Sequence, residues 1–417
     1  MPHAFDPTVP RRSRYPNLSS TGSVAALPAV PRAADVHSIA PTPTPTPTTY
    51  APMPLHFVVP HGIYLHEAAC VAVDSANRVV CFNRGSMPLM IFDANGWLLN
   101  VNKWNGTRDL FAGYDPYESG LSKTVRWSAS EFVKPHGLTI DENDDLWLVD
   151  VGAHVITHCT MRGDRRLMLL PGPRAVTDPR QMRDLIGEKQ VPALQQSGKA
   201  FNQPCNVAVQ RRADGHVFVC DGYGNSRVHC FRRSDGAHVR SWGTSGTRLG
   251  EFNLPHDAAV LHRHTTNPMD DRLLVADREN HRVQLFALDG TPLQQWHVHR
   301  PCGLALSHDE PRLYVAQLAA GHATQRTGGQ ASTAKWTRNI GNCVSIHSPE
   351  TGLELGRIAG GVATDAPTGM LEPHGVAVAR DGRVYTASVS FHREGVYRQP
   401  VPYILATLKA WKPVQSA

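Results

Sequence analysis

Short apolar runs bounded by Gly, Asn and Asp dominate the chain from about residue 55 onward. The segment from Arg272 to Asp277 reads Arg-Leu-Leu-Val-Ala-Asp, and the segment from His281 to Phe286 follows it after three residues. β-Branched and aromatic residues in runs of this length, separated by turn residues, are typical of a strand, a turn and a second strand. The pattern predicts many short strands and few helices.

One apolar strand of the form Gly-Val-Ala-Val recurs six times, with starts 46 to 72 residues apart. The copies are Cys70 to Val73, Gly137 to Ile140, Asn206 to Val209, Asp257 to Val260, Gly303 to Leu306 and Gly375 to Val378. Each is followed by a second apolar strand, such as Leu146 to Asp150. This spacing suits four-stranded propeller blades with insertions. We therefore predict an all-β fold, a six-bladed β-propeller, with surface insertions near 160–200 and 317–342.

The position just before this strand alternates between histidine and other residues. Its occupants are Ala69, His136, Cys205, His256, Cys302 and His374, and all but the first follow a proline. The innermost strand of a blade lines the central channel, so histidines on alternate blades would point inward about 120° apart, as a three-histidine metal site requires. Zn²⁺ is the default ion for neutral imidazoles. The structural alternative is an imidazole that only hydrogen-bonds a neighbouring carbonyl. Cys205 and Cys302 share the column, as soft ligands, as oxidation-sensitive neighbours or as buried packing residues.

Proline content separates the two ends of the chain. Residues 1–54 hold 12 of the 32 prolines, including alternating Pro and Thr from Pro41 to Pro47. Such a segment is extended and buries no core. We predict a disordered Pro/Thr-rich tail over 1–54 and the propeller over 55–417. The 417 residues are 41% hydrophobic and 19% charged, which excludes collagen, a coiled coil and a wholly disordered chain.

Charge and cysteine usage exclude several classes of partner. The net charge is +6, with Lys and Arg in no run longer than a pair, so we expect no nucleic-acid partner. No run approaches the ~20 apolar residues that span a bilayer, so we expect no membrane partner. The eight cysteines form no C-x-x-C pair and read as reduced, buried thiols. We expect a cytoplasmic monomer, although the start of the chain is compatible with weak export.

Several short motifs between residues 65 and 380 carry a resemblance to a known family. They include Phe82-Asn-Arg-Gly85, Pro135-His-Gly-Leu138, Asp221-Gly-Tyr-Gly-Asn225, Pro255-His256, Val275-Ala-Asp-Arg-Glu-Asn280 and Pro373-His374. In these motifs the chain resembles the NHL-repeat propellers, and more closely the peptidyl-α-hydroxyglycine α-amidating lyases (peptidylamidoglycolate lyases).

The resemblance implies an activity and a set of site residues. Lyases of this family are six-bladed propellers that split a peptidyl-α-hydroxyglycine into an amide and glyoxylate. By resemblance, His136, His256 and His374 would hold the zinc, the same trio that the repeat column selects. The catalytic tyrosine would be Tyr223 and the two active-site arginines Arg84 and Arg278. The arginines would hold the substrate carboxylate, and Tyr223 would act as the base where zinc and arginine favour its phenolate.

The chain also departs from the family. An aspartate that binds calcium in the family follows the third histidine, whereas this chain has Gly375 there, which argues against a structural calcium. We expect no copper monooxygenase domain in this chain, so a small N-acyl-α-hydroxyglycine is an alternative to a peptidyl substrate. Two other functions stay open: a non-catalytic NHL-type propeller that binds a protein, peptide or glycan, and a lactonase-type metallohydrolase, for which the column lacks carboxylates.

Overall fold

The fold is described from a computed structural model. It describes residues 49–100, 132–169, 201–318, 341–358, 370–389 and 407–414, apart from 54–55, 60–64, 66, 86, 164, 213, 264 and 371. The predicted insertions lie largely outside these residues, as does most of the predicted tail. None of the described helices is long and apolar enough to cross a bilayer.

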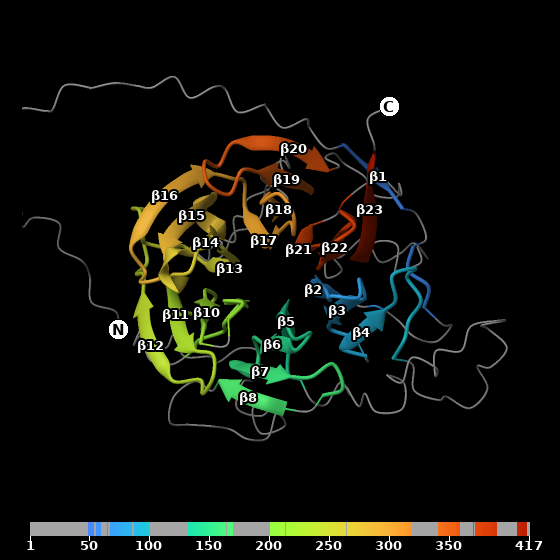
Figure 1. The fold of residues 1–417 in the computed structure, drawn as a ribbon, viewed down its shortest axis with the longest axis horizontal. Coiled ribbons are helices and arrows are strands. Elements are labelled where there is room, and N and C mark those ends of the chain that lie inside the picture. Colours follow the sequence, from blue (N-terminus) through green and yellow to red (C-terminus); the bar gives the residue numbers. More distant parts are fainter. Residues whose placement is uncertain are drawn as a thin grey trace, which may run out of the picture. The chain divides into compact units, whose positions relative to one another are not determined.

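Six antiparallel sheets surround a central axis, so the predicted six-bladed β-propeller is confirmed (Figure 1). Blade one contains β2 (Ala68–Val73), β3 (Val79–Asn83) and β4 (Leu89–Phe92). Blade two contains β5 (Pro135–Ile140), β6 (Leu146–Asp150), β7 (Val155–Cys159) and β8 (Arg165–Leu169). Blade three contains β9 (Asn206–Val209), β10 (His216–Asp221), β11 (Arg227–Arg232) and β12 (His238–Trp242). Blade four contains β13 (Pro255–Leu261), β14 (Arg272–Asp277), β15 (Arg282–Ala287) and β16 (Pro292–His297). Blade five contains β17 (Pro301–Leu306), β18 (Leu313–Gln317), β19 (Cys343–His347) and β20 (Glu354–Ile358). Blade six contains β21 (Pro373–Val378), β22 (Val384–Ser388), β23 (Leu408–Val414) and β1 (Thr49–Pro52). Two short 3₁₀ helices, η3 (Pro268–Asp270) and η4 (Arg278–Asn280), flank β14.

The ring of blades is closed by the N-terminal strand. β1 pairs antiparallel with β23, Thr49 opposite Val414 and Pro52 opposite Trp411, so the outermost strand of blade six comes from the other end of the chain. The boundary that we placed between residues 54 and 55 therefore differs from the structure, because Thr49–Pro52 belong to the propeller sheet. A Pro/Thr-rich edge strand of this kind gives no apolar alternation in the sequence.

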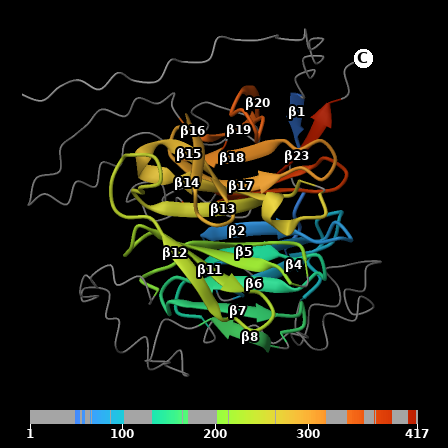
Figure 2. The same cartoon turned by 60° about the vertical axis from the view of Figure 1, so that its left-hand side comes forward.

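The core lies between the blades. The described buried apolar residues form six clusters, and each cluster joins two neighbouring blades, including blades six and one. Figure 2 shows the same blades in a view turned by 60°. Because every blade face is covered by the next, the inner strands hold their positions around the channel.

A backbone irregularity marks the column of histidines. In five inner strands the pairing with the second strand skips one residue, and that residue is the column residue: Ala69, His136, His256, Cys302 or His374. A β-bulge turns one side chain away from the alternation of the sheet. In four blades the residue two positions earlier has a positive φ, as at Gln203 (62°) and Leu254 (67°). The three histidines of the column all lie at such a bulge, which turns each of them out of the alternation of its strand.

Candidate metal centre

His136, His256 and His374 meet at the axis of the propeller. They come from the inner strands of blades two, four and six, and they are 2%, 2% and 5% exposed. Their ring centres are 4.6 to 5.0 Å apart, and one ligand nitrogen from each ring lies within 4.8 Å of the others. The alternation in the sequence therefore predicted a real spatial cluster.

Each histidine is held by the backbone of the next blade. The Nδ1 atoms of His136, His256 and His374 lie 2.7 Å from the carbonyl oxygens of Cys205, Cys302 and Ala69, respectively. A carbonyl only accepts, so each Nδ1 donates, and the lone pair of a neutral ring is left on Nε2. Such a bond fixes the tautomer and orientation of a metal-binding histidine. The carbonyl contact of the structural alternative is present. It also orients each ring and leaves the lone pair on Nε2, the atom that would bind a metal ion.

The surroundings keep these rings neutral. Burial, followed by the charges of neighbouring groups such as His374 and Arg84, lowers the pKa of His136 well below its ordinary value. Burial likewise lowers the pKa of His256 and brings that of His374 to about 3. A neutral imidazole is the form that binds a metal ion. Three converging Nε2 atoms with an adjacent pocket fit a tetrahedral cation site with one open position.

The two cysteines of the column do not join this cluster. Cys205 and Cys302 are buried, and burial raises the thiol pKa of both, to about 12 for Cys302. The Cys302 sulfur lies against the His256 ring, 3.4 Å from Nδ1 and 3.7 Å from Nε2, and is not part of the three-histidine group. Both residues contribute their backbone carbonyls instead. All eight cysteines of the chain are free and buried, as predicted.

Tyr223 lies beside the histidines. It belongs to the turn between β10 and β11, and its hydroxyl is 3.0 Å from Nε2 of His136 and 3.2 Å from Nε2 of His256. Although 38% of the residue is exposed, desolvation of the hydroxyl raises its pKa to about 12, while the charge of Arg278 acts in the opposite direction. The structure thus brings this predicted residue to the same cavity as the histidine trio.

Arg278 and Arg84 are held on different blades by carboxylates. Arg278 donates to Glu279 (2.8 Å) and to the Tyr223 hydroxyl (3.3 Å), and its guanidinium carbon lies 5.4 Å from the centre of the tyrosine ring. Arg84 pairs with the buried Glu67 and donates to the carbonyl of Pro135 (3.1 Å). Both guanidinium groups line the same pocket as His136 and His374.

The pocket around these groups has a volume of about 570 Å³ and repeats a pattern from blade to blade. One ring consists of residues that directly follow the second strand in five of the six blades: Arg84, Val151, Arg278, Leu318 and Val389. A second ring lies two residues before the column: Lys134, Gln203, Arg300 and Glu372. Glu67 occupies the same position in blade one. The sequence analysis identified neither this second ring nor Glu279. Counting two positions back from the column finds the residues of the second ring, but it does not find Glu279.

A second group of three potential ligands occurs in blade two. Asp141, Asp145 and His158 lie close together, but Arg233 pairs with Asp141 at 2.8 Å and Trp147 donates to the same carboxylate oxygen at 3.1 Å. The carboxylate already has a cationic partner. This group therefore joins blades two and three, whereas the three-histidine cluster remains the candidate metal centre.

The fold and the site define a six-bladed β-propeller with a buried three-histidine cluster on its axis. A scan against protein-family models finds no match. Among curated proteins, the chain is 34% identical over 162 residues to a probable peptidyl-alpha-hydroxyglycine alpha-amidating lyase of Caenorhabditis elegans, which covers 39% of each chain. It is 32% identical over 239 residues to the peptidylglycine alpha-amidating monooxygenase of Rattus norvegicus, over 55% of this chain and 21% of that protein. These relatives confirm the predicted resemblance to the amidating lyases.

Other comparisons concern the repeat and the fold. The human NHL repeat-containing protein 3 is 26% identical over 269 residues, 60% of this chain and 61% of that protein. A solved virginiamycin B lyase from Staphylococcus aureus has a TM-score of 0.43 at 12% identity, over 86% of this chain and 83% of the other. The chain spans well under half the length of the curated lyase and monooxygenase relatives described above.

Proposed function

We propose that this protein is a zinc-dependent lyase that cleaves a peptidyl- or N-acyl-α-hydroxyglycine to an amide and glyoxylate. The observation that carries the proposal is the convergence on one hydroxyl: Tyr223 lies within 3.3 Å of two histidine nitrogens and an arginine. The similarity to proteins named as amidating lyases supports the same reaction.

The reaction moves one proton and breaks one bond. The hydroxyl oxygen of the substrate loses its proton and forms the carbonyl of glyoxylate, while the bond between that carbon and the amide nitrogen breaks and the nitrogen takes up a proton. Tyr223 is the group placed to accept the hydroxyl proton. Bound to His136, His256 and His374, zinc would supply Lewis acidity and a positive charge that favours the phenolate. The charge of Arg278 acts in the same direction.

The two arginines would hold the carboxylate of the hydroxyglycine. Arg84 and Arg278 line the pocket, and each is oriented by a carboxylate behind it, which leaves donors directed to the cavity. A guanidinium binds a carboxylate through two parallel hydrogen bonds, which fixes the substrate's direction. Val133, Val151, Leu318 and Val389 form the apolar part of the lining. We propose that this part contacts the acyl group, which favours a small apolar N-acyl substrate.

The test is release of glyoxylate from α-hydroxyhippurate by the purified full chain, with and without zinc. We expect zinc-dependent release that disappears in His256→Ala. The matched control is His297→Ala, because His297 is exposed on the outer strand β16 and contacts no group of the pocket among the described residues. Zinc-loaded, folded protein that releases no glyoxylate would contradict the proposal and favour a propeller that only binds its ligand.

A further inference from the structure

A second cavity lies at the other end of the central channel. Its volume is about 250 Å³, and all six inner strands contribute to its wall. It shares no residue with the metal-side pocket, because along each strand the cavity lining begins after the column residue. A cavity of this size has room for several waters, and so for a ligand of a few non-hydrogen atoms.

The mouth of this cavity carries an arc of basic side chains. The residue two positions beyond the recurring apolar strand is Arg211 in blade three, His262 in blade four, His308 in blade five and Arg380 in blade six. The same position holds Ser75 and Glu142 in blades one and two. Four consecutive blades thus direct a basic group to one edge, and three of the four line the cavity.

The two arginines of the arc have unused donors. Within the described part of the chain, neither the Arg211 nor the Arg380 guanidinium forms a hydrogen bond or ion pair, whereas Glu142 is already paired with Arg233 at 2.5 Å. The charges are close to one another, because Arg211 and Arg380, after burial, lower the pKa of His308. The carboxylates of Glu142 and Asp309 lie near these charges, and Asp271 pairs with His262, but the two guanidinium groups bind no carboxylate directly among the described residues. Clustered basic groups with unused donors in a cavity mouth are typical of a binding site. Asp309, beside His308, is the exposed acidic group of the lining.

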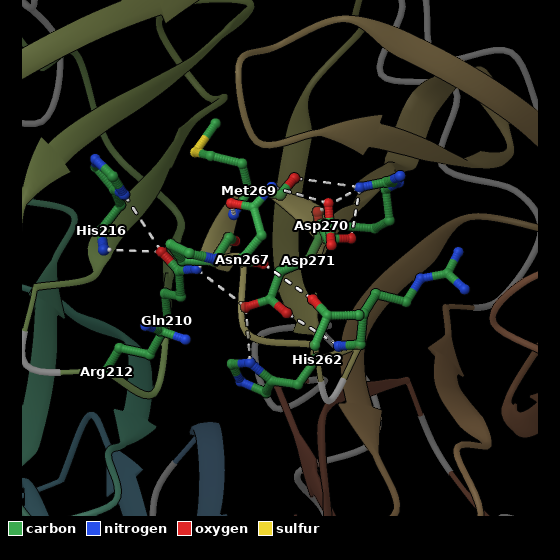
Figure 3. A network of polar contacts seen from close by, with 12 residues as sticks. Gln210, Arg212, His216, His262, Asn267, Met269, Asp270 and Asp271 are labelled. Atoms are coloured by element: carbon green, nitrogen blue, oxygen red, sulfur yellow. Dashed lines mark hydrogen bonds and ion pairs between the residues drawn. The ribbon is translucent and has the colours of Figure 1, made fainter.

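Hydrogen bonds hold the backbone of the arc in place. Figure 3 shows Asp271 accepting from Nδ1 of His262 (3.0 Å) and from the amide of Gln210 (3.0 Å). Gln210 is fully buried and directly precedes Arg211. In blade six, the backbone amide of Arg380 donates to the Asn77 side chain at 3.3 Å. The backbone that carries these side chains is therefore positioned before any ligand binds.

Apolar side chains form part of the inner wall of the cavity. Val209, Ile140, Leu306 and Val378 end their strands below the basic arc. At the floor, Asp257 is buried and accepts from Asn206, Ala258 and Leu304, each at 2.7 Å. A ligand suited to this shape has a negative end at the mouth and a short apolar body in the channel.

We propose that this second cavity binds a small organic anion, whose carboxylate contacts Arg211 and Arg380 and whose apolar part enters the channel between the inner strands. The site is independent of the metal centre and of the lyase reaction. A short-chain carboxylate such as butyrate has both features. Butyramide has the same shape without the charge, and inorganic phosphate has the charge without the apolar body.

Calorimetric titration of the full chain tests the site. We expect butyrate to bind saturably, one per chain, with butyramide not binding and phosphate binding more weakly. Arg211→Gln and Arg380→Gln should each raise the Kd of butyrate about tenfold or more, since each removes a charge-assisted hydrogen bond. Arg357→Gln, on the outer strand β20, is the matched control and should leave the Kd unchanged.

The metal-side pocket could also attract a carboxylate, so the titration is repeated in His256→Ala. We expect the same butyrate affinity there, and the same loss when Arg211 is replaced. The proposal is overturned if butyrate does not bind, if phosphate binds as tightly as butyrate, or if both arginine variants bind butyrate like the parent chain. Loss of butyrate binding in His256→Ala alone would place the anion at the metal centre instead.

Discussion

Replacing Gly137 by alanine should weaken metal binding through a contact between blades. Gly137 directly follows His136, and an added Cβ would lie 2.4 Å from Oδ1 of Asn206 and 2.6 Å from the carbonyl oxygen of Cys205. That carbonyl is the acceptor for Nδ1 of His136. Ordinary contacts to a Cβ are 3.4 Å or longer, so the inner strands of blades two and three must separate by several tenths of an ångström.

Two effects of different size follow from this separation. Overpacking of this kind costs about 1–3 kcal/mol of folding free energy, which should lower the Tm by a few degrees. Loss of the bond that orients a metal-binding histidine typically costs about 10–100-fold in metal affinity. We therefore expect Gly137→Ala to remain folded and to bind zinc about 10–100 times more weakly in competition with a chelator.

The matched control is another crowded glycine far from the histidines. In Gly215→Ala the new Cβ would lie 2.8 Å from the carbonyl oxygen of Gln210, within a turn of blade three. We expect a similar loss of Tm with unchanged zinc affinity. If Gly137→Ala loses stability but keeps its zinc affinity, the carbonyl does not orient the histidine and the reasoning is refuted.

Three further predictions concern the pocket and the contact between blades two and three. Tyr223→Phe should lower kcat for glyoxylate release about 10²–10⁴-fold with zinc content unchanged. The control Tyr385→Phe removes a buried hydroxyl without a described partner and should leave kcat unchanged. Equal rates in the two variants would contradict a role for Tyr223 as base. Glu279→Gln should raise KM more than it lowers kcat, because Glu279 accepts hydrogen bonds from both Arg278 (2.8 Å) and Arg300 (2.9 Å). An unchanged KM would show that neither arginine depends on Glu279 for its position. Burial raises the pKa of Asp141, but hydrogen bonds from His158 and Trp147 and the charge of Arg233 outweigh burial and hold the pKa below its ordinary value. The ionised carboxylate therefore stabilises the fold above pH ~4, and this stabilisation is lost as the pH falls further. Arg233→Gln should therefore destabilise the protein by roughly 3–5 kcal/mol at pH 7 and by less near pH 3, as measured by urea unfolding; a difference independent of pH would contradict this account.

Much of the fold was predictable because the repeat is encoded locally. The apolar strand recurs in all six blades and the proline before the column in five of them, so six units and an inward-facing column follow from one alignment. The strand β1 was not predictable in this way. Its pairing with β23 joins positions about 360 residues apart, and the prolines that suit an edge strand are also typical of a disordered segment.

The three axial histidines were visible in the sequence, but the groups that orient them were not. His136, His256 and His374 occupy a column that any alignment of the repeats reveals. Their hydrogen-bond acceptors are backbone carbonyls of the next blade, which leave no trace in residue identity. Glu279 was missed because its role depends on which guanidinium groups its carboxylate reaches, which is a matter of tertiary geometry.

The most direct test of the account is a titration of metal-free protein with zinc while glyoxylate release from α-hydroxyhippurate is measured. The account predicts that activity rises in proportion to added zinc and saturates at one zinc per chain, and that His374→Ala abolishes both tight binding and activity. Full activity without zinc, or tight binding of one zinc that survives His374→Ala, would contradict a catalytic metal on the three axial histidines.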